Sequence, residues 1–192
     1  MTVNLKKGQR ISLEKSAGGT LTKVRMGLGW DAVKKRRFFG KRAQEIDLDA
    51  SCIVFSAQGQ RTDQVWFNQL VGKNGAIVHT GDNLTGDGEG DDESIIVDLQ
   101  ALPPDAHTLV FVVSSYSGQD FSQIENAYCR LIDATNEREI ARYELTGSGQ
   151  HTAQVMAKVS RDGAGWSMTA IGAIADGRTF RDLEPIARQY LG

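Results

Sequence analysis

Residues 108–114 read TLVFVVS. Five consecutive apolar side chains, three of them valine, are typical of a strand that is buried on both faces. The β-branched valines also favour an extended backbone. This run therefore predicts a central strand, with other elements packed on each side of its sheet.

Other strand-like segments surround this run. Val24, Met26 and Leu28 alternate with a basic residue and a glycine, which predicts one buried face. The remaining candidate strands, separated by turns rich in Gly, Asn, Asp and Ser, are residues 47–55, 64–70, 94–99, 127–132, 139–145, 153–159 and 166–174. Short strands at this spacing predict a mainly all-β fold, a two-sheet β-sandwich.

The C-terminal residues follow a different period. In residues 179–191, apolar side chains recur at helical spacing, and Thr179 or Asp182 can cap the start. We therefore expect a short C-terminal helix, with Pro185 tolerable only near its first turn. No linker or fixed repeat interrupts the chain, so we expect one domain over residues 1–192 with a basic loop insertion at 32–45.

The composition excludes several classes of protein. Apolar residues make up 40% and charged residues 24%, which is ordinary for a globular chain and does not favour disorder. The N-terminus has no apolar segment after its basic residues, and no apolar run reaches the roughly 18 residues that a membrane helix needs. We expect a cytoplasmic protein.

Cys52 and Cys129 lie in apolar runs and are interpreted as buried free thiols, with a disulfide as the alternative.

The net charge of -2 conceals a strong asymmetry along the chain. Residues 1–73 contain 14 Lys or Arg and 6 Asp or Glu, whereas residues 74–129 contain 10 Asp or Glu and no Lys or Arg. The acidic stretch cannot neutralise its own carboxylates. The basic N-terminal third, solvent or a bound cation must do so.

The chain contains one densely acidic segment, in which half of the residues carry a carboxylate. Residues 82–93 contain six of them in twelve positions, and glycines there let the backbone turn its carbonyls inward. Calcium takes six to eight oxygen ligands, and the segment has no Cys or His that would favour zinc or copper. The spacing does not fit an EF-hand, because Asp87 stands where that loop needs glycine. A solvated acidic turn without a ligand is the alternative. The candidate ligands are Asp82, Asn83, Gly86, Asp87, Gly88, Gly90, Asp91, Asp92 and Glu93.

Further carboxylates lie at strand ends outside this segment. Asp47 and Asp49 are two residues apart, so their side chains share one face, and Asp31 ends another predicted strand. Loops at one end of a sandwich converge, so these three residues are candidate ligands as well. Solvated strand ends are the alternative. His79, His107 and His151 are interpreted as structural or solvated.

Several motifs together resemble the TerD family of tellurium-resistance and stress-response proteins, and in particular its TerZ-like members. They span nearly the whole chain: VRMGLGWD at 24–31, IDLDAS at 46–51, residues 79–95, ENAYCRL at 125–131, ARYEL at 141–145 and MTAIG at 168–172. The resemblance implies a β-sandwich that binds calcium, with more than one ion expected, through the acidic loop and nearby aspartates. It also implies bacterial cytosol, other tellurium-resistance proteins and a membrane-bound protein as partners, and no established catalytic activity.

The insertion at 32–45 departs from simple members of that family. Its cations flank two adjacent phenylalanines, a composition suited to an anionic membrane surface or a membrane-bound partner. The same composition suits phosphate backbones or the chain's own acidic loop, and a flexible solvated loop is a further alternative; we expect no nucleic acid. The candidate contact residues are Lys34, Lys35, Arg36, Arg37, Phe38, Phe39, Lys41 and Arg42.

These features favour a calcium-binding interaction module that is not an enzyme. One rival is a metal-dependent, phosphatase-like hydrolase that uses the acidic loop, and another is a metal-free scaffold. The sequence shows no nucleophile elbow or catalytic triad order. Preference for Mg²⁺ or Mn²⁺ with turnover would favour the hydrolase, whereas calcium-independent stability would favour the scaffold.

Overall fold

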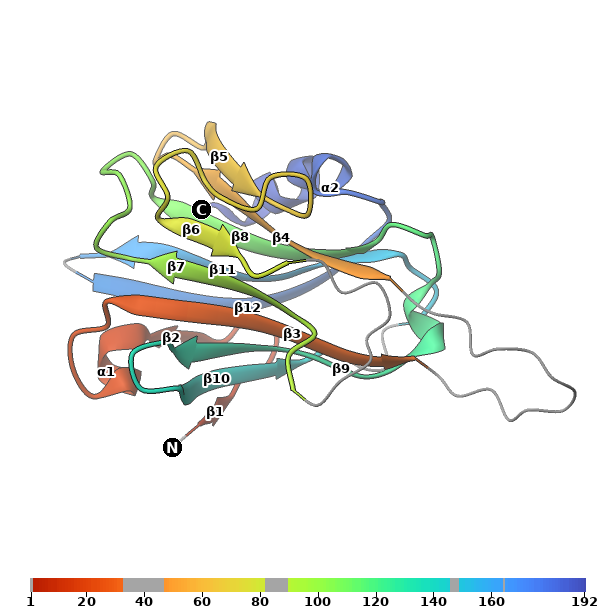
Figure 1. The fold of residues 1–192 in the computed structure, drawn as a ribbon, viewed down its shortest axis with the longest axis horizontal. Coiled ribbons are helices and arrows are strands. Elements are labelled where there is room, and N and C mark those ends of the chain that lie inside the picture. Colours follow the sequence, from red (N-terminus) through yellow and green to blue (C-terminus); the bar gives the residue numbers. More distant parts are fainter. Residues whose placement is uncertain (1, 33–46, 82–89, 146–148, 164) are drawn as a thin grey trace, which may run out of the picture.

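Two six-stranded sheets face each other in the computed structural model, which describes residues 2–32, 47–81, 90–145, 149–163 and 165–192 (Figure 1). Sheet A has the order β1-β10-β9-β3-β7-β6, with bounds Val3–Asn4, Arg138–Glu144, Ile124–Asp133, Lys23–Ala32, Glu93–Asp98 and Ile77–His79. Sheet B has the order β2-β12-β11-β8-β4-β5, with bounds Arg10–Ser12, Gly165–Ala175, Ala153–Asp162, Thr108–Ser115, Leu48–Phe55 and Arg61–Val65. The predicted two-sheet β-sandwich is confirmed.

Strand β8 lies inside sheet B between β11 and β4, and all eight of its residues are buried. Leu109, Phe111 and Val113 belong to the main core between the sheets. Val110 and Val112 belong to a second apolar cluster on the other side of sheet B. The prediction of a strand buried on both faces is therefore confirmed. Sheet B has an apolar cluster packed on each of its sides.

The second cluster is covered by helix α2, Phe180–Ala187, which continues into the 3₁₀ turn η2, Arg188–Tyr190. Thr179, one of the two predicted capping residues, is the N-cap, and it forms a capping box with Asp182. Phe180, Leu183 and Ala187 are buried against sheet B, so the amphipathic face holds the helix in place. Pro185 is the sixth residue of the helix and so lies beyond the first turn, to which we expected it to be confined.

Strand β3 turns one face inward. Val24, Met26, Leu28 and Trp30 are buried in the main core, as the alternation predicted. The intervening residues, among them Arg25 and Gly27, therefore lie on the outer face of sheet A. That outer face carries the site described below.

Some elements differ from the predictions. The candidate strand 64–70 is instead β5, which ends at Val65, because Trp66 and Gln69 bond to each other through both backbone N–H and C=O groups and turn the chain. Strands β1, β2 and β6 and the five-residue helix α1, Leu13–Ala17, were not predicted, since segments of two to five residues carry almost no periodicity. Cys52 and Cys129 are buried free thiols, as expected. Within the described ranges, no helix is long and apolar enough to cross a membrane.

Candidate functional site

The acidic segment connects β6 to β7, the last two strands on one side of sheet A. Of its predicted ligands, Gly90, Asp91, Asp92 and Glu93 are described by the structure. The others, Asp82, Asn83, Gly86, Asp87 and Gly88, lie outside the described residues, as do the predicted contact residues of the basic insertion. The described part of the acidic loop is therefore its base, residues 90–93.

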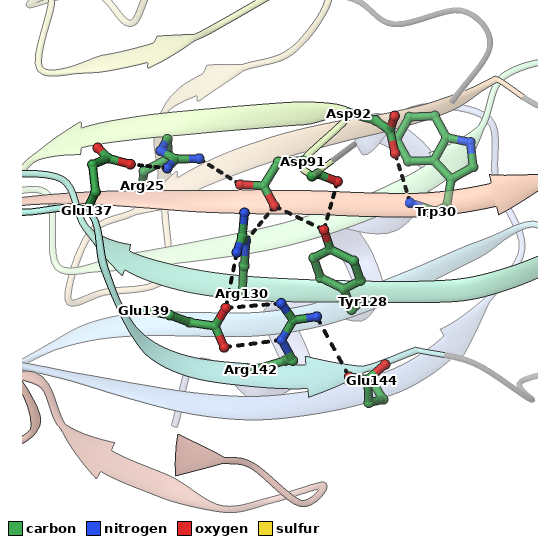
Figure 2. Close-up of polar contacts among 11 residues, drawn as sticks. Arg25, Trp30, Asp91, Asp92, Tyr128, Arg130, Glu137, Glu139, Arg142 and Glu144 are labelled. Carbon is green, nitrogen blue, oxygen red and sulfur yellow. Dashed lines mark hydrogen bonds and ion pairs between the residues drawn. The ribbon is translucent and has the colours of Figure 1, made fainter. Parts of the chain in front are cut away.

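Asp91 is held by two arginines on the outer face of sheet A (Figure 2). Its Oδ2 accepts from Arg25 Nη1 at 2.6 Å, and its Oδ1 accepts from Arg130 Nε at 2.6 Å. The carboxylate is only 4% exposed, so these charge-assisted bonds form with little competition from water. Each oxygen of Asp91 is therefore already engaged by a guanidinium.

Tyr128 contacts the same part of the acidic loop. Its hydroxyl donates to the carbonyl of Gly90 at 2.8 Å and lies 3.4 Å from Asp91 Oδ1. Burial raises the pKa of Tyr128 above its ordinary value of 10, and the charge of Asp91 raises it further, so the phenol stays protonated and remains a donor. The carbonyl of Gly90, a predicted ligand, is thus already an acceptor in this structure.

Two glycines of β3 make room for these contacts. A Cβ on Gly27 would stand 2.2 Å from Asp91 Oδ2, and a Cβ on Gly29 would stand 2.5 Å from the ring of Tyr128. Gly29 and Tyr128 are direct cross-strand partners, as are Gly27 and Arg130. Residues without a Cβ therefore let the acidic loop and the tyrosine lie directly on the strand.

The ion pairs continue across sheet A. Arg130 Nη1 contacts Glu139 Oε2 at 3.2 Å, and Arg142 Nη2 contacts the same oxygen at 3.0 Å. Arg142 also lies over the ring of Tyr128, 4.1 Å from its centroid. Burial opposes ionisation of Glu139, but hydrogen bonds from Arg142 and Arg130 outweigh it, so its pKa lies below the ordinary value of 4.5. The result is a chain of alternating charges that ends at the acidic loop (Figure 2).

The next two carboxylates tie the loop to two different strands. Asp92 Oδ2 accepts from the backbone N–H of Trp30 in β3 at 2.9 Å, and Asp92 N–H donates to the carbonyl of Leu28. Glu93 Oε2 accepts from the backbone N–H of Ala50 in β4 at 2.7 Å. Trp30 immediately precedes Asp31, and Ala50 immediately follows Asp49. The base of the loop therefore meets both of the strands that carry predicted aspartate ligands.

Asp49 does not lie on the same side of the sandwich as Asp91. Asp49 is buried in β4 on the side of Ile53 and Phe55, which belong to the cluster under α2, whereas Ala50 belongs to the core between the sheets. Asp47 is half-buried and precedes the strand. The backbone of Asp31 pairs with Glu125 in β9, and its side chain lies outside the described part of the structure. Asp91 lies over the opposite outer face of the sandwich.

Among the described residues, no group of three or more His, Cys, Asp and Glu side chains has the arrangement of a metal site. The thiols are also chemically quiet: burial raises the pKa of Cys129 to about 12 and that of Cys52 further still.

The residues that anchor Asp91, namely Arg25, Tyr128 and Arg130, were not predicted. One signal pointed to them: two glycines inside a strand, Gly27 and Gly29, mark a place where another part of the chain approaches closely. Asp91 has two arginine partners, Arg25 and Arg130. One of them, Arg25, comes from the basic N-terminal third that the charge map offered as a neutralising region.

The geometry defines a class of protein: a β-sandwich whose sheet A holds an acidic loop by its base. Comparison with known proteins gives the family. The model of the TerD domain matches residues 1–190, and the chain belongs to that family. The tellurium resistance protein TerZ of Serratia marcescens is 44% identical over 184 residues, which cover 94% of each chain. The stress response protein SCP2 of Bacillus subtilis (strain 168) is 38% identical over 204 residues and covers 100% of each chain.

A solved structure shares the fold at lower identity. It is that of a Streptomyces coelicolor A3(2) homologue of the telluride resistance protein TerD, with a TM-score of 0.69 and 19% identity over 90% of this chain and 98% of that chain. The chain is thus a member of a tellurium-resistance and stress-response family. The names of TerZ and SCP2 refer to resistance and stress response and state no catalytic activity.

Proposed function

We propose that this chain is a calcium-binding stress-response module, with the acidic loop as its calcium site. The observation that carries this proposal is the pair of adjacent bonds from Asp92 to the N–H of Trp30 and from Glu93 to the N–H of Ala50. They bring the base of the loop to the two strands that carry Asp31 and Asp49. The base of the loop therefore contacts the backbone of both strands, at the residue that precedes Asp31 and at the residue that follows Asp49.

The donor set at this position suits a hard cation. His79, which precedes the loop in the sequence, has Nδ1 accepting from the N–H of Gly81 and Nε2 against the carbonyl of Ala50, so both nitrogens are already engaged by the backbone. The remaining donors are oxygens, which calcium and magnesium prefer and which zinc and copper sites rarely use alone. Zinc is therefore a poor fit for these residues.

The charge balance supports the same cation. Arg25 and Arg130, which compensate Asp91, both come from outside residues 74–129, a stretch that itself contains ten carboxylates and no Lys or Arg. Two unit charges 4 Å apart repel by about 4 kcal/mol at an effective dielectric constant of 20. A divalent ion among Asp82, Asp87, Asp92 and their neighbours would remove that repulsion, with Asp91 as the anchor of the loop.

We propose a binding role and not a catalytic one. The described thiols are buried with raised pKa values, and both nitrogens of His79 are engaged, so neither supplies a nucleophile or a general base at this site. The module would act in the cytoplasm through calcium-dependent contacts with other tellurium-resistance proteins.

Calorimetric titration and thermal unfolding with Ca²⁺, Mg²⁺ and Mn²⁺ test the site. Calcium at a hundredfold excess over its dissociation constant should raise the free energy of unfolding by about 2.7 kcal/mol. Asp87→Asn should weaken that effect, whereas Asp105→Asn, which removes an exposed carboxylate of the same acidic stretch outside the loop, should not. Absence of any calcium effect at about 1 mM, the weak end of protein calcium sites, would refute the proposal. Phosphatase turnover with Mg²⁺ or Mn²⁺ would favour the hydrolase instead.

The basic insertion supports a second part of the proposal, a contact at the inner face of the membrane. Each Lys or Arg near an anionic surface contributes about 1 kcal/mol, and Phe38 and Phe39 add apolar area. Co-sedimentation with phosphatidylserine vesicles, with and without calcium, measures this contact. Equal sedimentation after deletion of residues 34–42 would show that the insertion is not the contact.

A further inference from the structure

The two ends of the acidic loop meet inside the sandwich. His79 ends β6 before the loop, and Glu93 begins β7 after it. His79 Nε2 and Glu93 Oε2 are 3.4 Å apart, and both side chains are 0% exposed. A histidine and a glutamate placed this deep in a core need specific partners, because an unsatisfied buried polar group is costly.

Their shared partner is the backbone of Ala50 in β4. Glu93 Oε2 accepts from Ala50 N–H at 2.7 Å, and His79 Nε2 lies 3.2 Å from the carbonyl of Ala50. Strand β5 pairs with β4 only from Cys52 to Phe55, so β5 does not reach Ala50. The side chains of His79 and Glu93, both from sheet A, thus contact the backbone C=O and N–H of Ala50 in sheet B, beyond the end of β5.

The other nitrogen of His79 contacts the start of the loop. Gly81 N–H donates to Nδ1 at 3.1 Å, and Gly81 has φ +126°, a region that favours glycine. Because Nδ1 accepts a hydrogen bond, it carries no proton, which leaves the neutral tautomer with a proton on Nε2. Nε2 lies 3.2 Å from the carbonyl of Ala50 and 3.4 Å from Glu93 Oε2. One imidazole therefore joins the first turn of the loop to the opposite sheet.

We propose that His79 is a positioning residue for the acidic loop: through Gly81 it fixes the point and direction at which the loop leaves β6. Glu93 fixes the other end on the same residue of β4. The distance between the two loop ends is then set by the core and not by the loop. This inference rests on the proposed calcium site, whose affinity depends on that spacing because a loop held at both ends loses less conformational freedom on binding.

Two substitutions separate the two contacts of the imidazole. His79→Asn can place an amide oxygen near the position of Nδ1 and so retain the acceptor for Gly81, but it loses the contact with Ala50. His79→Gln can place its amide nitrogen near the position of Nε2 and so retain the contact with Ala50, but it loses the acceptor for Gly81. His107→Gln, at a half-buried histidine next to β8, is the matched control.

His79→Gln should bind calcium about fivefold more weakly than the unmodified chain, the loss expected for one hydrogen bond. His79→Asn and His107→Gln should bind within about twofold of it, even where His79→Asn lowers the melting temperature more. Equal calcium affinity in His79→Gln and the unmodified chain overturns the proposal. So does an affinity loss that follows the melting temperature and not the contact with Gly81.

A readout without calcium separates this inference from the proposed function. In calcium-free protein, the amide of Gly81 should exchange with deuterium about fivefold faster in His79→Gln than in His79→Asn. If the unmodified chain binds no calcium, the proposed function fails, while this difference in exchange still supports the positioning role and its absence overturns it. Nitrogen NMR of the unmodified chain gives a test without any variant, because a proton found on Nδ1 of His79 also overturns the assignment.

Discussion

The two outer faces of the sandwich are built from opposite chemistries. The outer face of sheet B is apolar and lies under α2, where Phe180 and Leu183 are buried against β4, β8 and β11 (Figure 1). The outer face of sheet A carries Arg25, Asp91, Arg130 and their partners in a chain of ion pairs (Figure 2). Apolar burial supplies free energy in proportion to area, whereas the attraction within a partly buried ion pair is offset by the desolvation of its charges. The first face therefore stabilises the fold, and the second positions a loop.

The largest expected effect lies on the apolar face. Leu183→Ala removes a fully buried side chain between α2 and sheet B and should lower the free energy of unfolding by about 3 kcal/mol, measured by urea unfolding. Calcium affinity of the folded protein should stay unchanged, because the acidic loop is anchored to sheet A and to Ala50. A parallel loss of calcium affinity in folded Leu183→Ala would show that the two faces are coupled and would break the comparison.

A smaller effect on stability, with a larger effect on the loop, is expected on the charged face. In Gly27→Ala the new Cβ would collide with Asp91 Oδ2, so the carboxylate must leave Arg25 or Arg130. We expect a loss of about 1–3 kcal/mol in unfolding free energy, together with weaker calcium binding.

Gly19→Ala is the control for Gly27→Ala, since a Cβ there meets no atom within 4 Å. It should change stability by less than about 0.5 kcal/mol and leave calcium binding intact. Equal calcium affinity in Gly27→Ala, Gly19→Ala and the unmodified chain would mean that Asp91 does not position the loop.

The smallest effect concerns acid. The pKa of Glu139 is lowered in the folded chain, so its stabilising contribution is present above its unfolded pKa of about 4.5 and is lost as the pH falls through the lower folded value. Glu139→Gln should therefore lose less stability than the unmodified chain between pH 5 and pH 3, by about 1 kcal/mol or less.

Asp182 offers the comparison on the other face. Its pKa is also lowered, chiefly by the backbone N–H of Arg178, and then by Thr179 at the start of α2. Asp182→Asn should likewise flatten the acid dependence of unfolding. An acid profile of Glu139→Gln that superimposes on that of the unmodified chain would remove Glu139 from the ion-pair chain as a stabilising member.

The sandwich could be predicted from local patterns because its strands carry them. Residues 109–113 indicate burial on both faces through an unbroken apolar run, and Val24, Met26 and Leu28 indicate one buried face through alternation. The C-terminal helix was predicted from its 3.6-residue period and from the capping residue Thr179. The turn at Trp66 was not, because its backbone bonds to Gln69 leave no mark in the pattern of apolar residues.

The acidic loop was predicted from composition, but its supports were not. Asp91 and Arg130 are 39 positions apart, and Glu93 and Ala50 are 43 apart, so no local pattern links them. His79 was interpreted as a structural or solvated histidine. Its burial agrees with a structural role, but only the fold reveals that its partners are the start of the loop and a strand of the other sheet.

The pairing of the first two strands bears on how the chain is made. β1 pairs with β10 through Val3 and Ala141 at one edge of sheet A, and β2 pairs with β12 through Ser12 and Ser167 at one edge of sheet B. A ribosome therefore releases β1 and β2 long before their partners exist, and domains rich in such distant pairings fold slowly. Sheet A has all of its strands once β10 has emerged, but in sheet B the edges of β2 and β11 stay open to pairing with another chain until β12 emerges. During synthesis, this protein should therefore depend on chaperones until its last strands are complete.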